Sequence, residues 1–214
     1  MGKLSRGFLG GFQGQLGTAY GCFWRLMDLI KAMPRKVKRP PTEAQLPVQL
    51  KFALMTAFLK RVGAIIKVGF QNKPGNQSAM NAAVAYNIGN AITGVSPDFL
   101  IDFTKLKFSE GELPMAFNAE VLIDTPATVK FLWELNVAGS EDGKPTDKAV
   151  FVVFNPVKNK LVTLSGVAVR SALAYTLAVP ANFSADEVHV WMSMVSADGK
   201  QVSESVYLGQ FLLL

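Results

Sequence analysis

The sequence has very little of the chemistry from which most enzyme sites are built. Its 214 residues include one cysteine, Cys22, and one histidine, His189. A single cysteine excludes an internal disulfide framework, and so few Cys and His side chains exclude a Cys/His zinc site. No Gly-Lys-Ser or Gly-Lys-Thr tripeptide occurs, which excludes a P-loop. We therefore predict no catalytic residues, no bound metal and no cofactor.

The few candidates for chemistry have simpler interpretations. His189 alternates with valines in a predicted strand, so we expect a solvent-facing or locally hydrogen-bonded side chain. Cys22 lacks a histidine partner, although Arg25 is near, and is expected to be a small buried hydrophobe. The loop 141–147 has three carboxylates but fits no calcium-loop spacing, so we expect a solvated hairpin loop.

Long uninterrupted hydrophobic runs are also missing. The apolar stretch 8–20 is broken by Gln13, Gln15 and several glycines, and we expect no signal peptide there. The most apolar later window, 52–70, contains three basic residues, so we expect no transmembrane segment. These features favour a protein of the cytoplasm or of an assembled particle.

Positive charge is in excess, and it is unevenly distributed. Residues 1–75 carry a net charge of +11, whereas residues 76–214 carry −5. A basic segment of this kind can bind nucleic acid, anionic lipid, or the acidic body of its own or a neighbouring copy. Only the third interpretation uses both halves of the chain.

Residues 1–41 are rich in glycine and aromatic residues. Five glycines at spacings of 3 and 4 would form one seam on a helix, but each glycine costs a helix about 1 kcal/mol relative to alanine. We favour an extended arm, in which glycines allow close backbone approach and aromatic side chains fill apolar sockets. The arm ends at a basic run between prolines, residues 33–41.

Residues 42–97 predict a helix pair. Thr42 and Gln45 form a capping-box pattern, and an apolar stripe then steps by 3 and 4 along one helix face. A second, alanine-rich helix is expected from about Ser78 to Thr93, followed by Gly94. The predicted stripe consists of Phe52, Met55, Leu59, Val62 and Ile66.

From residue 98 onward the hydrophobic period changes to two, and turn signals separate seven or eight short runs. This pattern predicts an immunoglobulin-like antiparallel β-sandwich over residues 98–214, within an α+β, mainly β chain. A hairpin is expected around Asp198-Gly199. The predicted core residues are Val129, Phe131, Trp133, Leu135, Leu173, Tyr175, Leu177, Val188, Val190 and Met192.

Several short motifs together resemble an uncharacterised bacterial domain-of-unknown-function family. They are the glycine-rich start, the segment 20–24, the basic stretch 35–39, the helix start 41–45 and the closing pattern 188–207. The resemblance spans nearly the whole chain. It implies the order arm, helices, β-domain, with the N-terminal segment belonging to the folded protein. It supplies no catalytic residues to transfer.

The basic run is the best candidate for contact with an anionic partner. No nucleic-acid-binding motif accompanies it, so nucleic acid is disfavoured and an acidic protein surface or solvation is preferred. The leading hypothesis is a non-enzymatic structural protein that self-assembles through its arm into a filament, shell or phage-tail-like particle. The predicted contact residues are Phe8, Phe12, Tyr20, Phe23, Trp24, Arg35, Lys36, Lys38 and Arg39.

The alternative hypothesis is a β-sandwich binding module for a glycan or a protein. Trp133, Trp191 and Tyr207 would be its contact platforms, provided that they form an exposed cluster on one sheet face.

Overall fold

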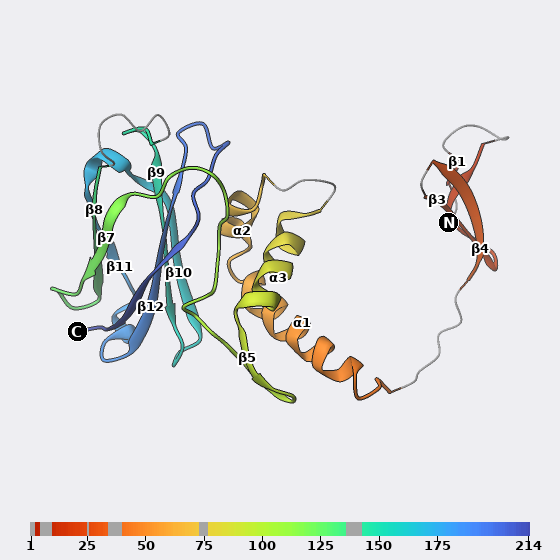
Figure 1. Cartoon of the computed structure of the whole chain (residues 1–214), viewed down its shortest axis with the longest axis horizontal. Helices are drawn as coiled ribbons and strands as arrows, with labels where there is room; N and C mark the ends of the chain where they lie inside the picture. The colour runs from red at the N-terminus through yellow and green to blue at the C-terminus, as the bar shows by residue number, and fades with distance from the viewer. Residues whose placement is uncertain (1–2, 5–9, 25, 34–39, 73–76, 136–142) are drawn as a thin grey trace. The chain divides into compact units, whose positions relative to one another are not determined.

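The computed structural model describes residues 3–4, 10–24, 26–33, 40–72, 77–135 and 143–214 (Figure 1). The chain divides into two compact units, residues 1–41 and residues 42–214.

The N-terminal unit contains a four-stranded antiparallel meander in the order β1-β2-β3-β4, which we call the N-terminal sheet. Its strands are β1 (Lys3–Leu4), β2 (Phe12–Leu16), β3 (Ala19–Trp24) and β4 (Met27–Ala32). The backbone is therefore extended, as we favoured, and not helical. The prediction of a single arm missed its reversals. Gly17 and Leu26, both at positive φ, lie in the tight turns between β2 and β3 and between β3 and β4.

Three helices open the second unit: α1 (Gln45–Lys60), α2 (Gly63–Gly69) and α3 (Ala79–Asn90). The predicted first helix is interrupted after Lys60, so its stripe runs over both α1 and α2. One half of the predicted capping box forms, since the Gln45 side chain accepts a hydrogen bond from the Thr42 amide. The Gln45 amide donates its hydrogen bond to the Thr42 carbonyl. The Ser78 hydroxyl caps α3 by accepting from the amide of Asn81.

Seven strands of the second unit form two antiparallel sheets, in the orders β10-β9-β12-β13 and β11-β8-β7. This is the expected immunoglobulin-like sandwich. A separate hairpin, β5 (Ile92–Val95) and β6 (Asp98–Ile101), precedes it. The sandwich strands are β7 (Phe117–Leu122), β8 (Thr128–Glu134), β9 (Lys148–Asn155), β10 (Lys160–Val169), β11 (Ala174–Ala178), β12 (Glu187–Val195) and β13 (Val206–Leu212).

The four-stranded sheet of this unit is the middle of three layers (Figure 1). One of its faces packs on the three-stranded sheet around Phe131, Phe151 and Val190. Its other face packs under the helices, where Trp191 and Phe154 meet Phe58 and other helix residues. Every residue of β12 after Glu187 is therefore buried, because both faces of the strand are covered.

Seven of the ten predicted sandwich-core residues are buried, Tyr175 is half-buried, and two are exposed. Leu135 is 45% exposed because β8 ends at Glu134, one residue earlier. Leu173 is 42% exposed because a 3-10 turn, Arg170–Ala172, interrupts the alternation and leaves Leu173 at a left-handed φ of 61°. In the predicted helix stripe, Phe52 is 55% exposed and the other four residues are buried.

A buried ion pair ties the loop before β9 to the sandwich. Arg170 and Asp147 are each 1% exposed, and their Nη2 and Oδ2 atoms lie 3.3 Å apart. The Arg170 guanidinium also donates to the carbonyl of Pro114, and the Trp133 indole donates to the carbonyl of Arg170. The prediction of a solvated acidic loop is thus wrong for Asp147, which is buried and forms an ion pair with Arg170. Residues 136–142 lie outside the described residues.

Candidate functional site

The N-terminal sheet carries large apolar side chains on one face. Strands β3 and β4 pair Tyr20 with Lys31, Cys22 with Leu29 and Trp24 with Met27. Residues paired across an antiparallel ladder point to the same face. Tyr20, Trp24 and Met27 are 43%, 52% and 50% exposed within this unit. We call this face, lined by Tyr20, Cys22, Trp24, Met27 and Leu29, face A.

The opposite face of the same sheet, face B, is also apolar. Its pairs across β3 and β4 include Gly21 with Ile30 and Phe23 with Asp28. Ile30 is 71% exposed and Phe23 41%. Leu16, whose partner is Ala19, lies on the same face and is 62% exposed. Neither face of the sheet contains a fully buried large side chain among the described residues.

One glycine of this sheet is required by its packing. Gly21 is buried, and a Cβ atom on it would overlap the carbonyl oxygen and the ring of Phe12. The Phe12 ring therefore lies across the bare backbone of Gly21, on face B. This is the close backbone approach that the glycine-rich composition predicted.

The predicted contact residues fall on both faces. Tyr20 and Trp24 lie on face A, whereas Phe12 and Phe23 lie on face B. Sequence reasoning missed Leu16 in β2 and Met27 and Ile30 in β4. In β4, Asp28 and Lys31 interrupt the apolar alternation that would have indicated Met27 and Ile30. Phe8, Arg35, Lys36, Lys38 and Arg39 lie outside the described residues.

Cys22 is half-buried on face A opposite Leu29, so it is less buried than expected.

His189 is locally hydrogen-bonded, in agreement with one of its two expected settings. It is 8% exposed, and its Nδ1 atom lies 2.8 Å from the Tyr207 hydroxyl. The Phe103 ring centroid lies 4.4 Å from the imidazole centroid. Burial lowers the pKa of His189 below its ordinary value of 6.5, against a smaller opposing effect of Glu187. The imidazole is thus a polar member of an aromatic cluster under the helices.

The tryptophans proposed as contact platforms are buried. Trp133 is 3% exposed inside the sandwich, and Trp191 is fully buried under the helices. Tyr207 is half-buried and bonded to His189. The exposed aromatic cluster that the alternative hypothesis required is therefore not formed by these three residues. Trp191 was misplaced because alternation with polar neighbours suggested an uncovered second face for β12.

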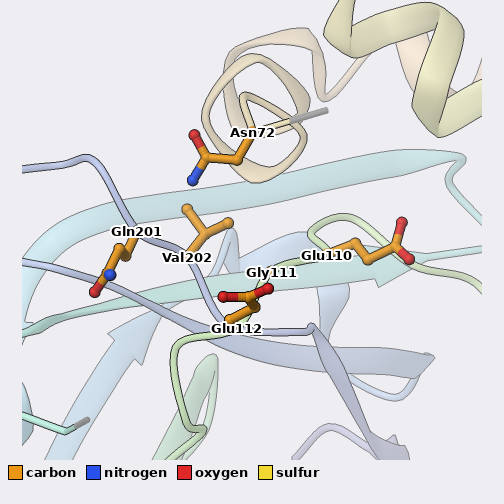
Figure 2. A pocket seen from close by; sticks show the side chains of 6 residues that line it. All are labelled: Asn72, Glu110, Gly111, Glu112, Gln201 and Val202. Carbon is orange, nitrogen blue, oxygen red and sulfur yellow. The ribbon is translucent and has the colours of Figure 1, made fainter. Parts of the chain in front are cut away.

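A hollow of about 420 Å³ opens between the end of α2 and two loops of the sandwich (Figure 2). Asn72, Glu110, Glu112 and Gln201 bring polar groups to it. In Figure 2 the carboxylate of Glu110 points away from that of Glu112. Over the described ranges, no group of three or more His, Cys, Asp or Glu side chains is placed to hold a metal ion.

Comparisons with known proteins identify a family. The sequence matches a family described as "Family of unknown function (DUF6266)" over residues 11–209. No curated protein matches it. Among solved structures, the chain is similar to the fn3 domain of human collagen alpha-1(XX) chain, at 17% identity and a TM-score of 0.35, covering 49% of this chain and 88% of that one. None of the described helices is long and apolar enough to cross a membrane.

Proposed function

The chain belongs to DUF6266, a family of unknown function, and we propose from its own residues that it is a non-enzymatic structural protein that self-assembles through its N-terminal sheet. The sandwich unit would be the repeated body of a filament, shell or phage-tail-like particle. The observation that carries this proposal is that both faces of the N-terminal sheet bear exposed large apolar side chains.

Exposed apolar surface on so small a sheet favours association. Full burial of one large apolar side chain stabilises by about 1.5–3 kcal/mol. Covering Tyr20, Trp24 and Met27 on face A alone would therefore favour docking by several kcal/mol before the entropy of association is subtracted. A four-stranded sheet without a second layer cannot cover them itself.

Charge supports a second copy as the partner. Residues 1–41 carry a net charge of +7, whereas residues 42–214 carry −1 and their part from residue 76 onward carries −5. Opposite net charges accelerate encounter and fix orientation, and their effect weakens as salt is added. The N-terminal unit of one copy is thus electrostatically suited to the acidic part of another.

The histidine supports a non-enzymatic function. His189 is the single histidine of the chain, and its described hydrogen bond goes to the Tyr207 phenol. The partner is neither a serine nor a cysteine, so this pair does not form the nucleophile–base arrangement of acyl-transfer enzymes.

The proposal is tested on the full chain by light scattering and negative-stain microscopy over a range of concentrations. The face A variant replaces Tyr20, Trp24 and Met27 by serine. Its matched control replaces Leu46, Val48 and Phe52, three α1 residues of similar exposure (42%, 67% and 55%), by serine. We expect assembly of the native chain and of the control, and monomers of the face A variant. Equal loss in both variants would contradict a specific role of the sheet.

Two further variants test whether the N-terminal unit docks on another copy or belongs to the core of its own chain. Replacing Arg35, Lys36, Lys38 and Arg39 by glutamine should slow assembly and shift its salt dependence while the fold is kept. Deleting residues 1–41 should leave a soluble monomer, because all three described core clusters lie within residues 42–214. If the native chain is monomeric at high micromolar concentration and the deletion unfolds it, self-assembly through the N-terminal sheet is wrong.

A further inference from the structure

A hollow of about 230 Å³ lies between α2 and the helix-covered face of the four-stranded sandwich sheet. We call it the α2 hollow. It is distinct from the hollow of Figure 2 and from the N-terminal sheet. The residues that line it come from α2, from the segment between β6 and β7, and from strands β9, β10 and β12: Ala64, Ile65, Val68, Gly69, Ser109, Val150, Ser165, Ser193 and Val195.

The hollow results from a gradient of side-chain size along the sheet. Across β12, β9 and β10, paired residues form rows that point to the helices. The first rows contain large side chains, which fill the space under α1 and α3. The row under α2 contains two serines around one valine, so the space there stays open. In order, the rows are His189, Phe154 and Leu161, then Trp191, Val152 and Thr163, then Ser193, Val150 and Ser165.

Helix α2 is held in place, so it cannot collapse into this space. Ile66 and Phe70, on its other side, are 0% and 1% exposed in the helix core. A Cβ atom on Gly69 would overlap the Phe108 carbonyl, and the Gly69 carbonyl accepts from the amide of Glu110 at 2.9 Å. Just beyond the helix, the Gln71 side chain donates to the carbonyl of Gly199 at 2.6 Å.

The lining defines the chemistry of a ligand. Ile65, Val68, Val150 and Val195 offer apolar walls, and none of the described residues that line the hollow is charged. Hydroxyl groups come from Ser109, Ser165 and Ser193. The Ser109 hydroxyl donates to the Ser203 carbonyl at 2.7 Å, which leaves its oxygen to accept a further bond. An uncharged molecule with an apolar chain and one hydroxyl group matches this lining.

We propose that the α2 hollow binds a small uncharged amphiphile, a medium-chain alcohol in chemical class. At roughly 30 Å³ per water-sized group, the hollow holds about seven or eight non-hydrogen atoms. The apolar chain contacts Ile65, Val68 and Val150, and the hydroxyl bonds to a serine of the lining. This site is independent of the N-terminal sheet and of self-assembly.

The test is methyl NMR of the full chain, carrying the face A substitutions if its assembly broadens the signals, titrated with 1-hexanol. We expect saturable shifts at Ile65, Val68 and Val150, and none at Val188 and Val190, which lie on the sandwich-core face of the same sheet. Hexanoate, matched in chain length but charged, should bind about tenfold or more weakly, because no cation lines the hollow. Absence of saturable shifts, or equal shifts on both sheet faces, would overturn the proposal.

Two variants sharpen the test. Val68→Trp should fill the hollow and weaken 1-hexanol binding about tenfold or more. Ser193→Ala should nearly keep the volume of the side chain, remove a hydroxyl and weaken 1-hexanol binding. Ala57→Leu on the exposed side of α1 is the control and should bind like the native chain. If Val68→Trp binds hexanol like the native chain, the site is not this hollow.

Discussion

The chain contains two four-stranded antiparallel sheets, and they differ in what covers their faces. In the sandwich sheet, β9 and β12 are buried on both sides, between a second sheet on one and three helices on the other. In the N-terminal sheet, exposed apolar side chains lie on both faces. The two sheets have the same number of strands and the same antiparallel pairing. The difference in burial therefore comes from the layers that cover the sandwich sheet.

The largest expected difference between the two sheets is in stability. Phe151 is fully buried and packs on Phe131 and Tyr175, with ring centroids 4.3 and 5.3 Å away. Phe151→Ala should lower the free energy of unfolding by about 3–5 kcal/mol, measured by urea denaturation. The matched Phe23→Ala, in the N-terminal sheet, should change it by less than about 0.5 kcal/mol. Equal losses would show that the N-terminal sheet is part of a core.

The buried ion pair should have a slightly smaller effect. Asp147→Ala leaves the Arg170 guanidinium buried without its carboxylate, which should cost about 3 kcal/mol. The exposed Asp198→Ala is the control and should cost under about 1 kcal/mol. Thermal unfolding at fixed pH measures both. A neutral Asp147→Ala would mean that water reaches Arg170.

Within the N-terminal sheet, the largest effect should come from Gly21→Ala. The new methyl group overlaps Phe12, so strands β2 and β3 must separate or Phe12 must leave face B. We expect this substitution to lower the stability of the N-terminal sheet by about 1–3 kcal/mol. Amide hydrogen exchange should become faster in β2 and β3 and stay unchanged in β9. Gly17→Ala, in an open turn at positive φ, is the milder comparison. Unchanged exchange in Gly21→Ala would refute the packing of Phe12 on Gly21.

The smallest expected effect is a pH dependence of the sandwich unit. Burial lowers the pKa of His189, so between that pKa and 6.5 the unfolded chain binds a proton that the folded chain does not. Stability should therefore fall as pH is lowered from about 6.5 toward the lowered pKa of His189. His189→Gln should flatten this slope in denaturation curves. A slope that persists in the variant would assign it to other groups.

The sequence predicts the sandwich well because its segments with a hydrophobic period of two do form β-strands. Val129, Phe131, Val188 and Val190 are buried as their alternation indicated. The same rule misplaced Trp191, because alternation describes a sheet with one covered face and the helices cover the second. The unbroken apolar run 149–154 was the available signal, since strands buried on both faces read as continuous hydrophobic segments.

The candidate site was predicted in part. Aromatic residues and glycines identified the N-terminal segment and its extended backbone. The sequence did not show that turns fold this segment into a sheet with two faces. Which face an aromatic occupies depends on the register set by those turns. The α2 hollow was not predictable, because it depends on the pairing of Ser165, Val150 and Ser193 across three strands.

The strand order β10-β9-β12-β13 also governs how the protein is made. Strand β9 lies between β10, its immediate neighbour in the chain, and β12, which is translated about thirty residues later. The last strand, β13, completes the sheet within three residues of the C-terminus. On the ribosome, the N-terminal sheet can pair once residue 32 has emerged, since each of its strands pairs with its neighbours in the sequence. The four-stranded sandwich sheet is complete only when β13 has been added, so the N-terminal sheet can fold before the sandwich.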